Sequence, residues 1–158
     1  MTASPALPAP SPSPSPSAPA SLDAGRHENG AKRAVRGTLV KVLLHERTDR
    51  GMELEPFAAR CVRRGEVHEL LTTDRWTDVP GARVDRVGFL GFVELENGGV
   101  LDRGDRVLIG GEPVGTVLGF DGCHLPNHYN VVIHAPRLLT GRSLGLTPET
   151  PVVFEPSG

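Results

Sequence analysis

From Val35 onward, hydrophobic and polar positions alternate with a period of two. In the stretch RGTLVKVLLHER, every second residue from Thr38 to Leu44 falls on one face, and Leu39 begins the opposite face. This period is that of a half-buried β-strand. The best helical candidate, residues 136–146, is short and interrupted by glycine. The pattern therefore predicts an all-β chain of short strands.

Turn signals divide this pattern into hairpins. Gly-containing pairs, which supply the positive φ angles of two-residue turns, occur at Arg64-Gly65, Asn97-Gly98 and Gly110-Gly111. Other glycines interrupt predicted strands, where strongly bent strands need them; they are Gly88, Gly91, Gly115 and Gly119. These features favour a small closed or partly open antiparallel β-barrel over a sandwich.

Composition separates the two ends of the chain. Residues 1–22 are almost entirely Pro, Ser and Ala and lack aromatic residues, so they cannot bury enough apolar surface to offset ordering entropy. We expect a disordered tail and linker over 1–34 and the β-barrel over 35–156. No basic, unbroken apolar leader precedes it, and no run approaches the roughly 20 apolar residues of a membrane span. A cytoplasmic location is expected, with Cys61 and Cys123 reduced.

The charge balance limits the partners. The formal net charge is −2, and the basic residues are interleaved with acidic ones through the ordered part. A surface that follows a phosphate backbone needs clustered Lys and Arg, so nucleic acid is not expected as a partner. No membrane partner is expected either. A small-molecule ligand is the predicted partner, and a homodimer stays open.

The C-terminal quarter resembles known small barrels. In HLPNHYNVVIHAPRLLTGRSLGLTPETPVVF (124–154), a strand ends at Ala135-Pro136, a turn leads to Leu-Gly-Leu, and a final strand follows. This order is similar to the closing part of cradle-loop or riboflavin-kinase-like barrels and, more weakly, to the glucitol-type phosphotransferase component A barrel. The resemblance implies architecture only, because the kinase glycine-rich loop is missing after Arg36. The pattern GFDGCHLPNHYN is identified as that of a small bacterial family of unassigned function.

The richest chemistry lies in GFDGCHLPNHYNVVIHAP, residues 119–136. A strand from about Tyr129 to His134 would place His128, Asn130, Val132 and His134 on one face. The other face, with Tyr129, Val131 and Ile133, would pack towards the core. The polar loop before this strand carries Asp121, Cys123 and His124. We expect the His128 face to look into a pocket at one mouth of the barrel.

These residues favour an enzyme that moves protons on a small polar metabolite, by isomerisation, cyclisation or elimination. Histidine suits this chemistry because its pKa lies near neutrality. The predicted catalytic residues are His128, His124 and Asp121. No cofactor is predicted. The predicted substrate-binding residues are Asn130, Cys123, Asn127 and His134.

Several alternatives remain open. A divalent metal could be bound by His124, His128 and Cys123, giving a metal-dependent enzyme. Against this alternative, Pro126 disfavours the helix that would bring both rings to one face. Cys123 could act as a nucleophile with a histidine base. A non-catalytic ligand-binding or dimerising barrel module is another alternative, and the segment could also be only a crowded polar turn.

Overall fold

A computed structural model describes residues 30–157, and this part of the chain contains twelve strands and no helix. Most of the segment predicted to be disordered, residues 1–29, lies outside the described residues. The strands are β1 (Val35–Val42), β2 (Glu46–Arg47), β3 (Met52–Glu53), β4 (Ala59–Val62), β5 (Val67–Thr73), β6 (Arg83–Val84), β7 (Val87–Leu95), β8 (Gly99–Asp102), β9 (Arg106–Ile109), β10 (Glu112–Asp121), β11 (Asn130–His134) and β12 (Pro151–Glu155).

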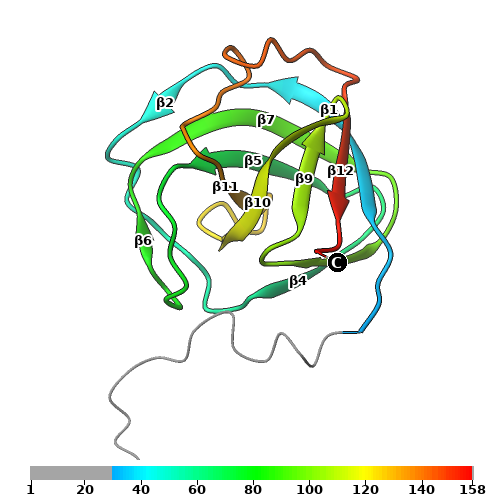
Figure 1. The fold of residues 1–158 in the computed structure, drawn as a ribbon, viewed down its shortest axis with the longest axis horizontal. Coiled ribbons are helices and arrows are strands. Elements are labelled where there is room, and N and C mark those ends of the chain that lie inside the picture. Colours follow the sequence, from blue (N-terminus) through cyan, green and yellow to red (C-terminus); the bar gives the residue numbers. More distant parts are fainter. Residues whose placement is uncertain (1–29, 158) are drawn as a thin grey trace, which may run out of the picture.

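One large sheet dominates the fold, and its hydrogen bonding is ring-like. The strands follow the order β1-β12-β9-β10-β11-β5-β7-β2, and an additional pairing of β1 with β7 joins the two sides (Figure 1). The sheet is mixed, because β11 and β5 pair in parallel while the other pairs are antiparallel. The expectation of a purely antiparallel sheet is wrong at this pair, which the long connections around β11 allow.

Of the three turn signals, only one connects two paired strands as a hairpin. Gly110 and Gly111 have φ angles of 61° and 81° and connect β9 to β10 in a two-residue hairpin, as predicted. Arg64-Gly65 lies at a turn and Asn97-Gly98 at a bend, but in each case the two flanking strands do not pair with each other. Instead, β4 pairs with β8 in a small separate sheet, while β5 and β7 pair within the large sheet. Burial explains this partition, since β5 is almost wholly buried and β4 is largely accessible.

Glycines inside the strands permit close approach of neighbouring backbones. A Cβ atom on Gly91 would collide with the carbonyl oxygen of Lys41, and one on Gly115 with that of His134. The registers of β1–β7 and β9–β10 shift near these positions, as expected where strands bulge and bend. The predicted role of glycine in bent strands therefore holds.

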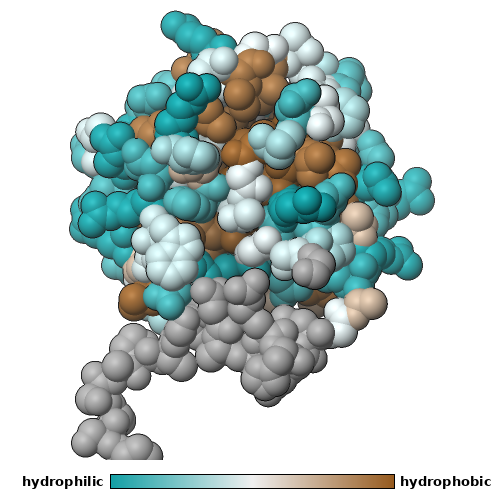
Figure 2. All heavy atoms as spheres, in the orientation of Figure 1, coloured by the Kyte–Doolittle hydropathy of each residue, from teal (hydrophilic) through white to brown (hydrophobic). Residues whose placement is uncertain are grey.

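The central strands are buried on both faces. Leu70 belongs to a large apolar cluster that includes residues from β1, β9 and β12, whereas its neighbour Leu71 packs in a second cluster with Met52 and Val84. Val131 and Val132 on β11 divide in the same way, which corrects the expectation of one apolar face and one polar face there. On the face seen in Figure 2, hydrophobic side chains reach the surface between hydrophilic ones.

Candidate functional site

The site is built on β5, which lies between β11 and β7. Glu69 pairs with Asn130 on one side and with Phe92 on the other. Because side chains alternate along a strand, Glu69 shares a face with Leu71, and Asn130 shares a face with Val132. Both apolar residues belong to the second cluster. The carboxylate and the amide are therefore neighbours on the face of the sheet that carries this cluster.

The loop between β10 and β11 folds over that face. The backbone N–H of His128 donates to the carbonyl oxygen of His124 at 3.3 Å, so the loop makes one tight turn. The rings of His124 and His128 stack with centroids 4.9 Å apart and an interplanar angle of 20°. The expectation that Pro126 would keep these rings apart is wrong, because a single turn brings them together without a helix.

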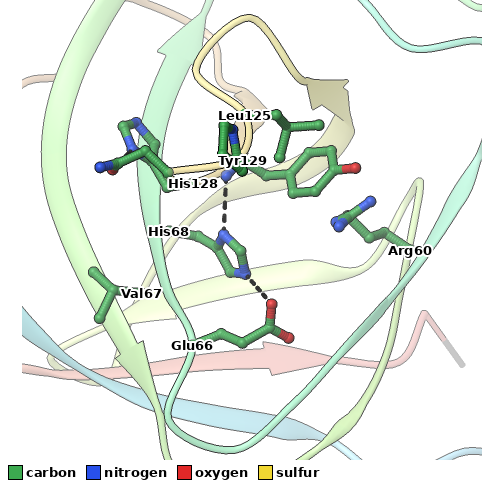
Figure 3. Close-up of a pocket in the computed structure, with 9 residues that line it drawn as sticks. Arg60, Glu66, Val67, His68, Leu125, His128 and Tyr129 are labelled. Atoms are coloured by element: carbon green, nitrogen blue, oxygen red, sulfur yellow. Dashed lines mark hydrogen bonds and ion pairs between the residues drawn. The ribbon is translucent and has the colours of Figure 1, made fainter.

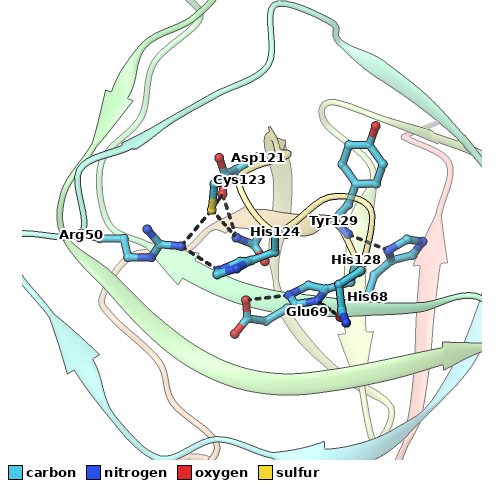
Figure 4. A network of polar contacts seen from close by, with 10 residues as sticks. Arg50, His68, Glu69, Asp121, Cys123, His124, His128 and Tyr129 are labelled. Carbon is cyan, nitrogen blue, oxygen red and sulfur yellow. Dashed lines mark hydrogen bonds and ion pairs between the residues drawn. The ribbon is translucent and has the colours of Figure 1, made fainter.

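Glu69 completes a three-residue cluster with these histidines (Figure 4). Oε2 of Glu69 lies 3.6 Å from Nε2 of His128, and ligand atoms of Glu69, His124 and His128 all lie within 4.8 Å of one another. Glu69 is buried and was not among the residues predicted for the site. Its local signal is a carboxylate that shares a strand face with Val67 and Leu71, and a buried carboxylate is uncommon without a partner.

One contact of the cluster bears on the tautomer of His128. Its Nδ1 lies 2.7 Å from Oδ1 of Asn127, and the tautomer with the proton on Nδ1 donates to this oxygen and leaves a lone pair on Nε2. Within the described chain, Nε2 is buried without a hydrogen-bond partner. Burial lowers the pKa of His128 and raises that of Glu69. The lone pair of His128 therefore faces the carboxyl group of Glu69.

Arg50 borders the cluster on the loop side. Its guanidinium donates to Nε2 of His124 and to Sγ of Cys123, both at 3.1 Å. Its positive charge helps to lower the pKa of Glu69 against the larger effect of burial. Arg50 was not selected from the sequence either, since nothing in its local pattern distinguishes it from other surface arginines.

Asp121 and Asn130 form a polar pair beside the cluster. The amide nitrogen of Asn130 donates to Oδ2 of Asp121 at 2.7 Å, and the thiol of Cys123 donates to the same oxygen at 2.9 Å. Burial, followed by the hydrogen bond to Asp121, raises the pKa of Cys123, which disfavours a nucleophilic thiolate. Cys123 is not a member of the Glu-His-His cluster, which corrects its place in the predicted metal set.

The two remaining predicted substrate-binding residues, Asn127 and His134, lie in different places. Asn127 touches His128, as described above. His134 lies at the opposite end of β11 from Asn130, paired with Thr116 and Thr73. The structure therefore brings six of the seven predicted residues to one end of β11 and leaves His134 outside the group.

His128 is the one member of the cluster that also lies in the wall of a pocket of about 320 Å³ (Figure 3). His68 lies in the same wall, where Nδ1 accepts a hydrogen bond of 3.1 Å from the backbone N–H of Tyr129. Nε2 of His68 lies 3.3 Å from Oε2 of Glu66. Burial lowers the pKa of His68, and Glu66 opposes this effect. Of the predicted face of His128, Asn130 and His134, only His128 lies in this wall.

Comparisons with known proteins give the family of the chain but no activity. The chain belongs to a family of unknown function (DUF6917), whose profile matches residues 29–155. No curated protein and no solved structure matches the chain significantly, so the resemblance to cradle-loop barrels is not confirmed by a structural relative. No helical segment of the described chain has the length and hydropathy that a bilayer crossing requires.

Proposed function

We propose that this member of a family of unknown function is a divalent-metal-dependent enzyme that acts on a small polar molecule. Glu69, His124 and His128 hold the ion. The observation that supports the proposal is the convergence of their ligand atoms within 4.8 Å of one another, from a central strand and a separate loop. This set differs from the one expected from sequence by the exchange of Cys123 for Glu69.

The electrostatics of the pair His128–Glu69 favour a cation. A lone pair on a buried nitrogen and a carboxylate oxygen 3.6 Å away repel each other, and a metal ion or a proton between them relieves this repulsion. The hydrogen bond from Nδ1 to Asn127 orients the His128 ring in the way that metal-bound histidines are commonly oriented. An ion that uses Nε2 of His124 displaces the guanidinium of Arg50, which now donates to that atom.

Two nitrogen ligands and one carboxylate leave coordination positions open for water or substrate, as in catalytic metal sites. A bound divalent ion polarises a substrate oxygen and promotes proton transfer beside it. This chemistry suits the isomerisation, cyclisation or elimination expected from the sequence. The pocket beside His128 gives the substrate its place. In this proposal the strand ring is a closed barrel in a cytoplasmic protein, and its two unpaired cysteines agree with a reducing compartment.

The test begins with the metal. The full chain is purified without an affinity tag or chelator, and its bound elements are counted by mass spectrometry. Zn²⁺, Mn²⁺ and Co²⁺ are then titrated by calorimetry, and Co²⁺ binding is followed by visible absorption. We expect one ion per chain, and stabilisation of about 2.7 kcal/mol when the free ion is at 100 times its Kd.

The variants Glu69→Gln and His128→Ala should lose this binding, whereas His134→Ala serves as the matched control and should retain it. A chain that binds no ion stoichiometrically, or variants that bind as well as wild type, would overturn the metal site. Metabolites that shift the melting temperature of the loaded protein are then incubated with it and analysed by NMR. Ligands that bind but are recovered unchanged would contradict an enzyme and favour the non-catalytic binding module.

A further inference from the structure

Arg60 stands in the wall of the pocket beside His128, and the proposed metal site gives it no role. It lies on β4, and its guanidinium stacks over the ring of Tyr129, with Cζ 2.8 Å from the ring centroid (Figure 3). Among the described residues, Arg60 forms no ion pair within 4.0 Å, and its Nε atom is buried without a hydrogen-bond partner. A half-buried guanidinium in this state lacks the carboxylate that usually accompanies it.

Stacking determines which parts of Arg60 remain available. All donors of a guanidinium lie in its plane, so an aromatic ring on one face leaves the edge free for in-plane hydrogen bonds. A carboxylate matches this edge with two parallel bonds, whereas a tetrahedral phosphate matches it less closely and needs further donors. The stacked Tyr129 ring also holds the guanidinium in position before a ligand binds.

The rest of the wall fits an anion with a short apolar body. Leu125, Pro126 and Val67 supply apolar surface, and His68 adds a polar imidazole to the wall. Glu66 is the one carboxylate in the wall, and its Oε2 faces His68 at 3.3 Å. With a divalent ion on the His128 side, the pocket has positive charge at two places. Its volume of about 320 Å³ lies at the small end of ligand sites.

We propose that this pocket binds a small carboxylate, whose carboxyl group pairs with the edge of Arg60 and whose second oxygen-bearing group reaches the ion held by His128. This inference rests on the proposed function for the second contact, but the first contact belongs to Arg60 alone. The substrate of the enzyme is accordingly a short organic acid that carries a second oxygen donor, such as a keto, hydroxy or carboxyl group.

The test uses the full chain with malonate, succinate and glutarate as probes, together with malonamide and inorganic phosphate. Binding is measured by calorimetry with Zn²⁺ and, separately, with chelator. We expect a dicarboxylate to bind at least 10-fold more tightly than malonamide and phosphate. Arg60→Gln should weaken that binding about 10-fold or more and leave Zn²⁺ affinity unchanged. Arg64→Gln, an exposed arginine at the neighbouring turn, is the matched control and should bind like wild type.

The variant Arg60→Lys separates charge from geometry, because it keeps the charge and loses the planar fork. Arg60→Lys should bind the acid more tightly than Arg60→Gln but more weakly than wild type. Melting temperatures check that each variant is folded. Equal binding of acid and amide, tighter binding of phosphate, or an Arg60→Gln variant that binds like wild type would overturn the inference. If the chain takes up no Zn²⁺ in the titration but still binds the acid in an Arg60-dependent way, the acid site is supported and the metal site is rejected, so the two proposals fail separately.

Discussion

Nε2 of His128 lies 3.6 Å from Oε2 of Glu69, and this contact joins the loop after β10 to the central strand β5. The ring of His128 also packs edge-on against Phe92, with centroids 5.0 Å apart. The imidazole is thus held between a carboxylate and an aromatic ring, and its second nitrogen is tied to Asn127. Such restraint is what a metal ligand needs in order to bind without reorganisation.

Asn127 should influence metal affinity without touching the ion. Replacing it with Ala removes the acceptor for Nδ1 of His128, so the imidazole is free to rotate and to change tautomer. We expect Asn127→Ala to weaken Zn²⁺ binding about 10–100-fold, as for other residues that orient metal-bound histidines. Calorimetric titration measures this effect. Asn97→Ala is the control, because Asn97 bonds only backbone groups far from the cluster, and an equal loss there would contradict the assignment.

Thr72 should be important for stability. Its buried hydroxyl donates to the carbonyl oxygen of Leu139 at 2.7 Å and accepts from the N–H of Leu139 at 2.9 Å, which ties the segment after β11 to β5. Thr72→Val leaves both backbone groups unsatisfied and should lower the free energy of unfolding by about 1–3 kcal/mol. Urea denaturation measures the loss. Thr116→Val, at a half-buried position of β10, should change the free energy of unfolding little, and similar losses in both variants would argue against this role.

Replacing Gly115 with any larger residue should destabilise the fold. Its φ is unexceptional, but an added Cβ would meet the carbonyl oxygen of His134 on the paired strand. We expect Gly115→Ala to destabilise the chain by about 1–3 kcal/mol or more, through overpacking and strand separation. Gly30→Ala provides the comparison, because nothing lies within 4 Å of its added Cβ. Thermal unfolding of the two variants should therefore differ clearly, and equal melting temperatures would refute the close-contact explanation.

The ion pair of Asp74 with Arg86 should contribute a small, pH-dependent stability. The hydrogen bond from Arg86 lowers the pKa of Asp74, so the contribution is present above the unfolded pKa of about 3.9 and is lost as pH falls through the folded value. Since both side chains are partly exposed, Asp74→Asn should cost only about 0.2–1 kcal/mol at neutral pH.

Unfolding experiments at neutral pH and near pH 2 check this expectation, since the difference between wild type and Asp74→Asn should vanish in acid. Glu112→Gln is the matched control, because Glu112 lies exposed at the start of β10 and has no ion pair among the described residues. A difference for Asp74→Asn that is unchanged in acid would assign its effect to something other than the carboxylate.

Local features of the fold could be predicted from the sequence. Alternation placed strands over much of the described chain, and Gly110-Gly111 placed one true hairpin, because these signals depend on residues close together in the chain. Pairing was harder. The turn at Gly65 was correct as a turn, yet β4 pairs with β8, since the choice of partner depends on which faces must be buried across the whole sheet.

The sequence by itself determined that the chain is all-β, where glycine must bend it, and that polar residues gather between Asp121 and Asn130. Only the tertiary structure decided that His124 and His128 stack and that Glu69 meets them, because β5 and β11 are distant in sequence and pair in parallel. The same pairing brings His68 and Tyr129 together, and the small β4–β8 sheet carries Arg60 to the pocket. Local patterns record what each segment can bury, whereas a site depends on which segments become neighbours.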